Sequence, residues 1–233
     1  MIELRNWNID RDWSNDVLAR SASYSTISFD IFDTLITRGY ANPVDVFAEV
    51  EKRLVDAGFE RAEGFAQQRE TAEQRARKKH SAGRGAEDIS LDEIYAELPT
   101  LNPYFNHWEE AKARELQVEH DTLFAVPDTL ELVRQLYERG SNVVFVSDMY
   151  LPSSFLAEVL HNCGYSGCKE LIVSNEVNAT KASGNIWPLL EQRHAGPILH
   201  IGDDDWSDVE SPRRHGIDSI PFTRARTERR VGG

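Results

Sequence analysis

Helices and short apolar strands alternate along the second half of this chain. Four helical patterns occur, at 127–139, 152–163, about 184–193 and about 206–215, and an apolar strand follows each one, at 142–147, 171–173, 198–201 and 217–220. Strands that alternate with helices of this length form a parallel sheet whose two faces are both covered. The sequence therefore predicts an α/β fold built on a parallel sheet with helices on both faces.

One more strand, Thr26 to Ile31, precedes this series, and a long helical stretch separates the two. The helices expected there begin at Asn42–Pro43, span about Arg61 to His80, follow a capping box of Ser90 and Glu93, and begin at Asn102–Pro103. We expect residues 25–40 and 122–222 to form the α/β core and residues 41–121 to form a helical insert. Residues 1–24 are expected to be an N-terminal extension, and residues 223–233 a mobile basic tail.

Composition and charge exclude several classes of protein. Against 26 Lys and Arg stand 39 Asp and Glu, a net charge of −13 that argues against binding of nucleic acid. Two cysteines cannot build a disulfide framework or a four-thiolate zinc site. No apolar run approaches the ~20 residues of a membrane span, and the first residues lack the apolar region of a secretory signal. We expect a cytoplasmic protein without nucleic-acid or membrane partners.

Reactive side chains follow the strands, where ligands of such sheets bind. They are Asp30 after the first strand, Ser147 and Asp148 after the second, Lys181 after the third, and Asp203 and Asp208 after the fourth. Each one alone has a structural explanation as a turn, a cap or a solvated charge. Together, three carboxylates at one sheet edge need a cation, and Mg²⁺ suits such ligands. Ser147 and Lys181 could then bind phosphoryl oxygens, which predicts a phosphoryl-transfer site.

The same residues resemble the four motifs of the haloacid dehalogenase-like superfamily of hydrolases. In chain order they are Asp30 with Thr34, Ser147, Lys181, and Gly202–Asp203 with Asp208. The resemblance covers about 25–222 and implies a Rossmann-like core with a helical cap inserted after the first motif. Segments 28–35 and 146–151 are similar to a little-characterised bacterial branch, some members of which occur beside or fused to surface-polysaccharide glycosyltransferases. The resemblance to this branch therefore also implies an association with a glycosyltransferase.

The resemblance implies a role for each matching residue. Asp30 would be the nucleophile that forms an aspartyl-phosphate. Mg²⁺ would be bound by Asp30, the main-chain carbonyl of Phe32 and Asp203, with Asp208 beside it. Ser147 would bind the phosphoryl group, Lys181 would neutralise charge, and Thr34 would fix the motif loop. We also expect Asp148 to contribute to substrate binding.

A Mg²⁺-dependent phosphatase or phosphotransferase for a small phosphorylated metabolite is the leading hypothesis. Two alternatives stay open because members of the superfamily that act as phosphatases have a second Asp where this chain has Phe32. One is a metal-independent dehalogenase, which has an aromatic residue at this position. The other is a catalytically weak binding module associated with a glycosyltransferase.

The additional acid lies one residue later, at Asp33. In an extended segment side chains alternate, so Asp30 and Phe32 would share one side and Asp33 would point away. We therefore expect Asp33 to fix the loop rather than to act as the acid, unless the chain turns sharply at Ile31. In the insert, Arg69 falls in the apolar register of its helix and is the candidate to bind an anionic group of the substrate.

Overall fold

A five-stranded parallel sheet forms the centre of the protein. The computed structural model describes residues 7–40, 42–82 and 87–231. The strands are β1 (Thr26–Phe29), β4 (Asn142–Ser147), β5 (Glu170–Val173), β6 (Ile198–Gly202) and β7 (Asp218–Pro221), in the order β5-β4-β1-β6-β7. All four pairings are parallel, which confirms the predicted fold class.

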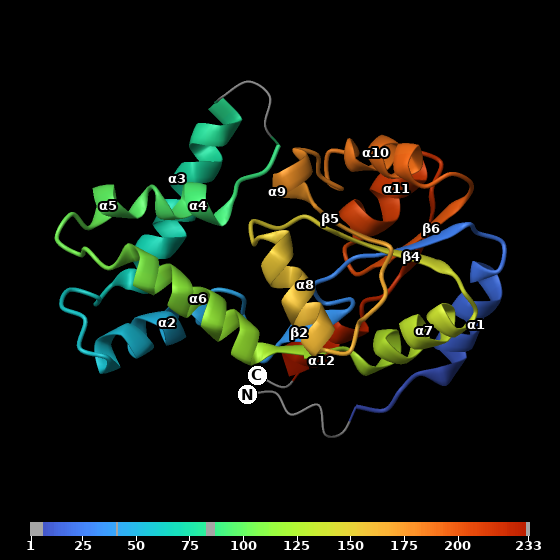
Figure 1. The fold of residues 1–233 in the computed structure, drawn as a ribbon, viewed down its shortest axis with the longest axis horizontal. Helices are drawn as coiled ribbons and strands as arrows, with labels where there is room; N and C mark the ends of the chain where they lie inside the picture. The colour runs from blue at the N-terminus through green and yellow to red at the C-terminus, as the bar shows by residue number, and fades with distance from the viewer. Residues whose placement is uncertain (1–6, 41, 83–86, 232–233) are drawn as a thin grey trace.

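Both faces of this sheet are buried because successive side chains of its strands enter different apolar clusters. Val143 and Phe145 lie in a cluster with residues of α1 (Arg11–Ser21), α7 (Pro127–Glu138) and α8 (Ser153–Asn162). Val144 and Val146 lie in a second cluster with residues of α10 (Ile186–Arg193). Helix α11 (Ser211–Arg214) lies beside α10 (Figure 1). Burial on both faces accounts for the continuous apolar runs of these strands.

Residues between β1 and α7 form a group of helices at one side of the sheet (Figure 1). They are α2 (Asp45–Asp56), α3 (Phe65–Ala82), α4 (Leu91–Tyr95), α5 (Leu98–Leu101) and α6 (Trp108–Thr122), which we call the helical insert. The capping box predicted for Ser90 and Glu93 is present at the start of α4. Five helices therefore stand in the described part of this stretch, where four were expected.

Three of the helix starts predicted in the insert were wrong. Helix α2 begins at Asp45, because the N–H of Asn42 donates to the Asp45 carboxylate and no side chain caps the helix. Helix α3 begins only at Phe65, after Arg61 and Gly64, which both have positive φ. Asn102 ends α5 rather than starting the next helix. Local polar contacts and left-handed turns thus decide these boundaries.

A short antiparallel ribbon joins the insert to the core, and the sequence did not reveal it. It pairs β2 (Ile36–Arg38) with β3 (Leu123–Ala125). A buried ion pair lies beside it: Arg38 Nε and Nη2 donate to Glu119 Oε2 and Oε1 at 2.9 and 3.0 Å. Strands of three residues carry too little periodicity to be recognised in a sequence.

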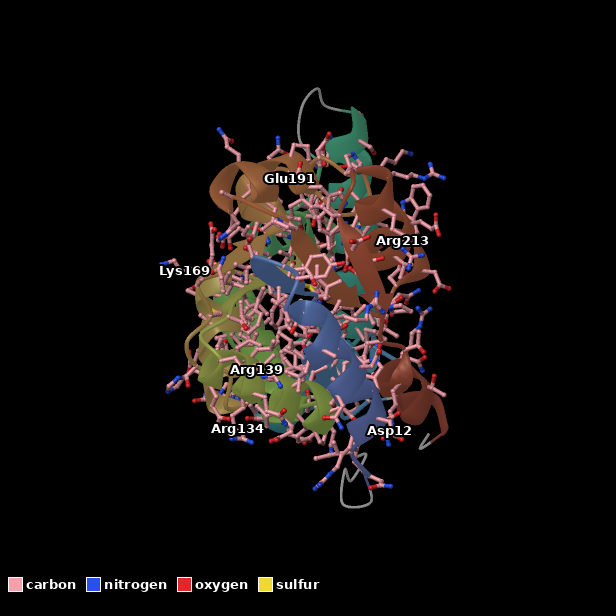
Figure 2. All side chains as sticks on the ribbon, turned by 90° about the vertical axis from the view of Figure 1, so that its right-hand side faces the viewer. Asp12, Arg134, Arg139, Lys169, Glu191 and Arg213 are labelled. Carbon is pink, nitrogen blue, oxygen red and sulfur yellow. The ribbon has the colours of Figure 1, made fainter. Side chains whose placement is uncertain are left out.

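The two ends of the described chain meet at a buried aspartate. Asp128, in the first turn of α7, accepts hydrogen bonds from Trp7 Nε1, from Asp10 N at 2.6 Å, and from Arg224 Nη1 at 2.8 Å. Figure 2 shows α1 crossing α7 near Arg139, whose Nη1 donates to the Leu18 carbonyl at 3.1 Å. Residues 224–231, expected to belong to a mobile basic tail, form helix α12 (Arg224–Val231).

None of the helices within residues 7–40, 42–82 and 87–231 combines the length and the apolar character that crossing a membrane requires.

Candidate active site

Asp30 lies at the carboxyl end of β1, between two neighbouring strands. Phe29 is in register with Phe145 of β4 and with Ile201 of β6. The N–H of Asp30 donates to the Ile201 carbonyl at 2.8 Å, so the ladder continues to the aspartate itself. This bond fixes the backbone of Asp30 at the edge where the loops after β4, β5 and β6 meet.

Three carboxylates gather at this edge around one lysine. Asp30, Asp203 and Asp208 offer oxygens that all lie within 4.8 Å of one another. Lys181 Nζ donates to Asp30 Oδ1 and to Asp208 Oδ1, both at 2.5 Å. The structure thus brings together four of the residues predicted from the strand ends.

A glycine lets Asp208 approach the sheet. A Cβ atom on Gly202 would lie 2.4 Å from Asp208 Cγ, so no other residue fits there without displacing the carboxylate. Asp208 lies in the π-helical turn η2 (Asp205–Glu210), which replaces the start of the single helix predicted at 206–215. The N–H of Asp204 donates to Asp208 Oδ2 at 3.0 Å. The close approach therefore depends on Gly202 and on this turn.

A histidine that the sequence did not single out supports Asp208 from within the sheet. His200 is fully buried in β6, with Nε2 3.0 Å from Asp208 Oδ1 and Nδ1 2.9 Å from Ser28 Oγ. Burial lowers the pKa of His200, so the ring is neutral, Nε2–H donates to Asp208 and Nδ1 accepts from Ser28. A histidine inside an apolar strand has the sequence pattern of a core residue, so the sequence alone does not indicate this contact with Asp208.

The cluster carries more negative charge than Lys181 balances. Burial raises the pKa of Asp30 well above its usual range against the opposing effect of Lys181, and Asp208 and Asp203 raise it further. Burial together with Asp33 and Asp208 raises the pKa of Asp203 to about 7. Although burial opposes its ionisation, Lys181 and the His200 hydrogen bond hold the pKa of Asp208 well below its usual range.

These residues fit a hard divalent cation. Carboxylate oxygens are the ligands that Mg²⁺ prefers, and one added cation would relieve the repulsion that raises the pKa of Asp30 and Asp203. Asp204 does not compete for this role, because its Oδ1 accepts from Trp206 N at 3.0 Å and Ser207 N at 2.7 Å. Arg226 of α12 lies at the rim, with Nη1 3.9 Å from Asp203 Oδ2.

Ser147 ends β4 at the same edge of the sheet, and Thr34 lies in the turn that follows Asp30. Ser147 is the last residue of β4, 1% exposed and two residues beyond the partner of Phe29. Thr34 is fully buried, and its Oγ1 has no hydrogen-bond partner among the described residues. Thr34 was expected to fix the motif loop, and in the structure its carbonyl ties the turn to α7 by accepting from Thr129 Oγ1 at 2.7 Å.

Asp148 holds a loop instead of facing a substrate. Its Oδ1 accepts from the N–H of Lys181 at 2.8 Å and its Oδ2 from the N–H of Ala182 at 3.1 Å. Both oxygens are thus engaged by the backbone that carries Lys181. The substrate-binding role predicted for Asp148 is corrected to one of positioning Lys181.

The substrate-binding role predicted for Arg69 was wrong. Arg69 is fully buried within the insert, where Nε and Nη2 donate to both oxygens of Glu115 at 2.8 Å. Its guanidinium also lies over the ring of Phe47 at 4.5 Å. The apolar register of Arg69 indicated burial, and its partner, 46 residues away in the sequence, could not be read from the pattern.

The chain turns immediately after Asp30. The carbonyl of Ile31 accepts from the N–H groups of Leu35 at 2.8 Å and Ile36 at 3.0 Å, and Asp33 has a φ of 58°. The extended alternation expected through Asp33 was therefore wrong beyond Ile31. Asp33 accepts from the Thr37 hydroxyl at 2.7 Å and lies close enough to Asp203 to raise its pKa.

Phe32, in the same turn, forms an isolated β-bridge with Ile36. The Arg38 guanidinium is 4.4 Å from the centre of its ring. Phe32 itself therefore offers no carboxylic acid to protonate a leaving group, and the nearest acid in the sequence is Asp33. With a divalent cation bound, the cluster could neutralise a transferring phosphoryl group.

Several solved structures share this fold. The putative hydrolase YfnB from Bacillus subtilis bound to magnesium is 17% identical, with a TM-score of 0.56 over 85% of this chain and 88% of that one. A 2-haloacid dehalogenase from Pseudomonas syringae pv. Tomato DC3000 is 12% identical, with a TM-score of 0.64 over 85% and 86%. A phosphatase from Thermococcus onnurineus is 17% identical, with a TM-score of 0.56 over 86% of each chain. A search of curated protein sequences found no match.

At these identities the neighbours show the fold alone, and they include both phosphatases and dehalogenases. The family assignment has a separate basis, since the family model described as haloacid dehalogenase-like hydrolase matches residues 24–216, a range that includes every residue of the cluster. The chain therefore belongs to the haloacid dehalogenase-like hydrolases.

Proposed function

We propose that this protein is a Mg²⁺-dependent phosphatase or phosphotransferase that acts on a small phosphorylated metabolite. The observation that carries the proposal is the group of three carboxylates around Lys181, whose oxygens lie within 4.8 Å of one another. A metal-independent attack on a carboxylate substrate would have to overcome this negative charge. Phosphoryl transfer suits such a site once a divalent cation is bound, because charge neutralisation is most of what the reaction requires.

Asp30 is the nucleophile in this proposal. Its free oxygen attacks phosphorus, the bond from phosphorus to the leaving oxygen breaks, and that oxygen departs with the electron pair. Water then attacks the phosphorus of the aspartyl-phosphate, which releases inorganic phosphate and restores the Asp30 carboxylate. If an alcohol attacked the aspartyl-phosphate in place of water, the phosphoryl group would pass to that alcohol and the enzyme would be a phosphotransferase.

The remaining residues position and neutralise the reacting groups. Lys181 favours the ionised form of Asp30 and balances charge on the phosphoryl oxygens. Ser147 lies at the same sheet edge and would donate to one of those oxygens. Asp30, Asp203 and the Phe32 carbonyl would bind Mg²⁺, with Asp208 beside it, and the ion would supply further neutralisation of the phosphoryl group.

Phosphate release from a panel of phosphorylated sugars, nucleotides and aryl phosphates tests the proposal. Release should require Mg²⁺, stop with EDTA, and be lost in Asp30→Asn. A matched control is Asp204→Asn, whose carboxylate caps a turn. Unchanged turnover in Asp30→Asn would refute the proposal.

The two alternatives give different results in the same assays. Chloride release from 2-chloropropionate in the presence of EDTA would instead indicate a dehalogenase. Mg²⁺ binding without turnover on any ester would favour a binding module.

A further inference from the structure

A segment of the insert holds the loop that carries Lys181. Residues 87–91, which lead into α4, run beside α9 (Ser174–Val177), and the loop after α9 leads to Lys181 (Figure 1). The Glu87 carboxylate accepts from Thr180 N at 2.9 Å, Thr180 Oγ1 at 3.3 Å and Ser183 Oγ at 2.5 Å, and also from Asn185 Nδ2. Glu87 thus binds residues on both sides of Lys181. We call these contacts the Glu87 latch.

Neighbouring residues extend the contact to the loop after β4. Asp88 Oδ2 accepts from Ser174 Oγ at 2.5 Å, and that hydroxyl accepts from Met149 N at 2.9 Å. The N–H of Leu91 donates to the Tyr150 carbonyl at 2.9 Å. Both core loops that frame Lys181 are therefore bound by one short segment of the insert.

The latch lies at a different end of the insert from the β2–β3 ribbon (Figure 1). The chain enters and leaves the insert through the two strands of the ribbon, so this connection is covalent. The latch consists only of hydrogen bonds between segments that are distant in the sequence. A rotation of the insert about the ribbon would leave the ribbon intact and break the latch. Thr180 would then lose the acceptor of its N–H, and the Lys181 loop would keep only its contacts with the core, from Asp148, Ser211 and Trp206.

From this geometry we infer that Glu87 is a positioning residue: it holds Lys181 against Asp30 only when the insert is seated on the core. The inference rests on the proposed function, because it concerns the lysine of that site. It makes substrate turnover conditional on closure of the insert, through a residue that touches none of the reacting atoms. Lys181 Nζ must bridge two carboxylates at 2.5 Å, so a shift of its loop removes the bridge.

Hydrogen exchange of the backbone amides tests the latch without any substrate. In Glu87→Ala, amides of residues 179–183 should exchange about tenfold faster, because Thr180 N–H loses a charged acceptor. Glu109→Ala, an exposed glutamate of the insert, is the matched control and should leave this exchange unchanged. Unchanged exchange in Glu87→Ala would overturn the inference, whether or not the protein releases phosphate.

Steady-state kinetics test the effect on Lys181. With Mg²⁺ and p-nitrophenyl phosphate, Glu87→Ala should lower kcat about 10- to 100-fold, as small misplacements of a charged group do, with little change of KM. Wild-type kcat in this variant would overturn the inference. If the wild-type protein released no phosphate, the proposed function would be refuted. Hydrogen exchange in Glu87→Ala would then still show whether Glu87 holds the Lys181 loop.

A second variant removes the latch from the core side in case Glu87→Ala folds poorly. Ser183→Ala combined with Asn185→Ala takes away two donors and leaves the insert unchanged. This pair should reproduce the kcat loss in part, and adding it to Glu87→Ala should cause no further loss, since both act through the same contacts. Additive losses would show that the two sides act separately and would overturn the inference.

Discussion

Individual residues at the sheet edge explain why we propose a cation for this site and where the sequence lacks an acid. The Asp203 carboxylate faces Asp33 and Asp208, and burial adds to their repulsion. Phe32 occupies the position of a missing carboxylate and lies under the Arg38 guanidinium. The motif residues could be predicted from their order along the strands. The turn at Ile31 could not, because it depends on two hydrogen bonds to one carbonyl.

Mg²⁺ binding should weaken as the pH falls through neutrality. The pKa of Asp203 is raised to about 7, so this ligand is mostly protonated at pH 6 and ionised at pH 8. Because the metal binds the ionised form, affinity should be about tenfold lower at pH 6 than at pH 8. Calorimetric titration at the two pH values checks this. Asp203→Asn should bind Mg²⁺ far more weakly than Asp204→Asn; equal losses would mean that the ligand is misassigned.

Loss of the acid at Phe32 should show in the choice of leaving group. The protein should cleave aryl phosphates and anhydrides, which depart unprotonated, far better than alkyl phosphates. Phe32→Asp should raise alkyl-phosphate turnover selectively, up to the roughly 10²–10⁴ that a positioned acid contributes. Asp33→Asn tests the alternative in the same assay. If it cripples alkyl-phosphate cleavage and spares p-nitrophenyl phosphate, then Asp33 is the acid.

At the scale of elements, the core was more predictable than the insert. The strands of the sheet and helices α7 and α8 follow from apolar runs between Pro and Gly, such as Pro127 and Gly140 around α7. The insert depends on pairs that are distant in sequence, such as Arg69 with Glu115 and Arg38 with Glu119. A pattern of residue types contains no information about such partners. For the same reason it identified Arg69 as a candidate for substrate binding.

Arg69→Ala should therefore reduce stability and leave substrate recognition alone. Removing one partner of a buried ion pair leaves Glu115 without its counter-charge and costs about 3–5 kcal/mol. Lys78→Ala, an exposed change on the same helix, should alter the unfolding free energy by less than about 0.5 kcal/mol. Urea unfolding measures both. A raised KM in folded Arg69→Ala would return this residue to the substrate site.

Over the whole molecule, Asp128 ties together segments from both ends of the described chain. Its carboxylate binds Trp7 and Asp10 before α1 and Arg224 at the start of α12. Helix α12 in turn brings Arg226 to the rim of the site. The sequence showed only a polar extension and a basic tail, because a contact between residues 96 positions apart leaves no local pattern.

Asp128→Ala should loosen both segments at once. Trypsin should then cleave at Arg11 or Arg20 and at Arg226 faster than in the wild-type protein, and the free energy of unfolding should fall by about 1–3 kcal/mol because three donors lose their buried acceptor. Arg224→Ala removes the contacts of this side chain with Trp7 and Asn8 but leaves the bonds of Asp128 to Trp7 and Asp10, so cleavage should increase mainly near α12. Mass spectrometry of the early fragments distinguishes the two variants, and wild-type cleavage of Asp128→Ala would contradict the arrangement.

The hydrogen bonds that run from Ser28 through His200, Asp208 and Lys181 to Asp30 also bear on how the protein folds. Ser28 and His200 are 172 residues apart in the sequence, and Lys181 and Asp30 are 151 apart. Contacts between such distant residues form slowly, because the chain must close long loops first. We therefore expect the contact between Asp30 and Lys181 to form late in folding, after the strands beside β1 have joined it. If the proposed activity depends on this contact, activity should return late when the unfolded protein is refolded.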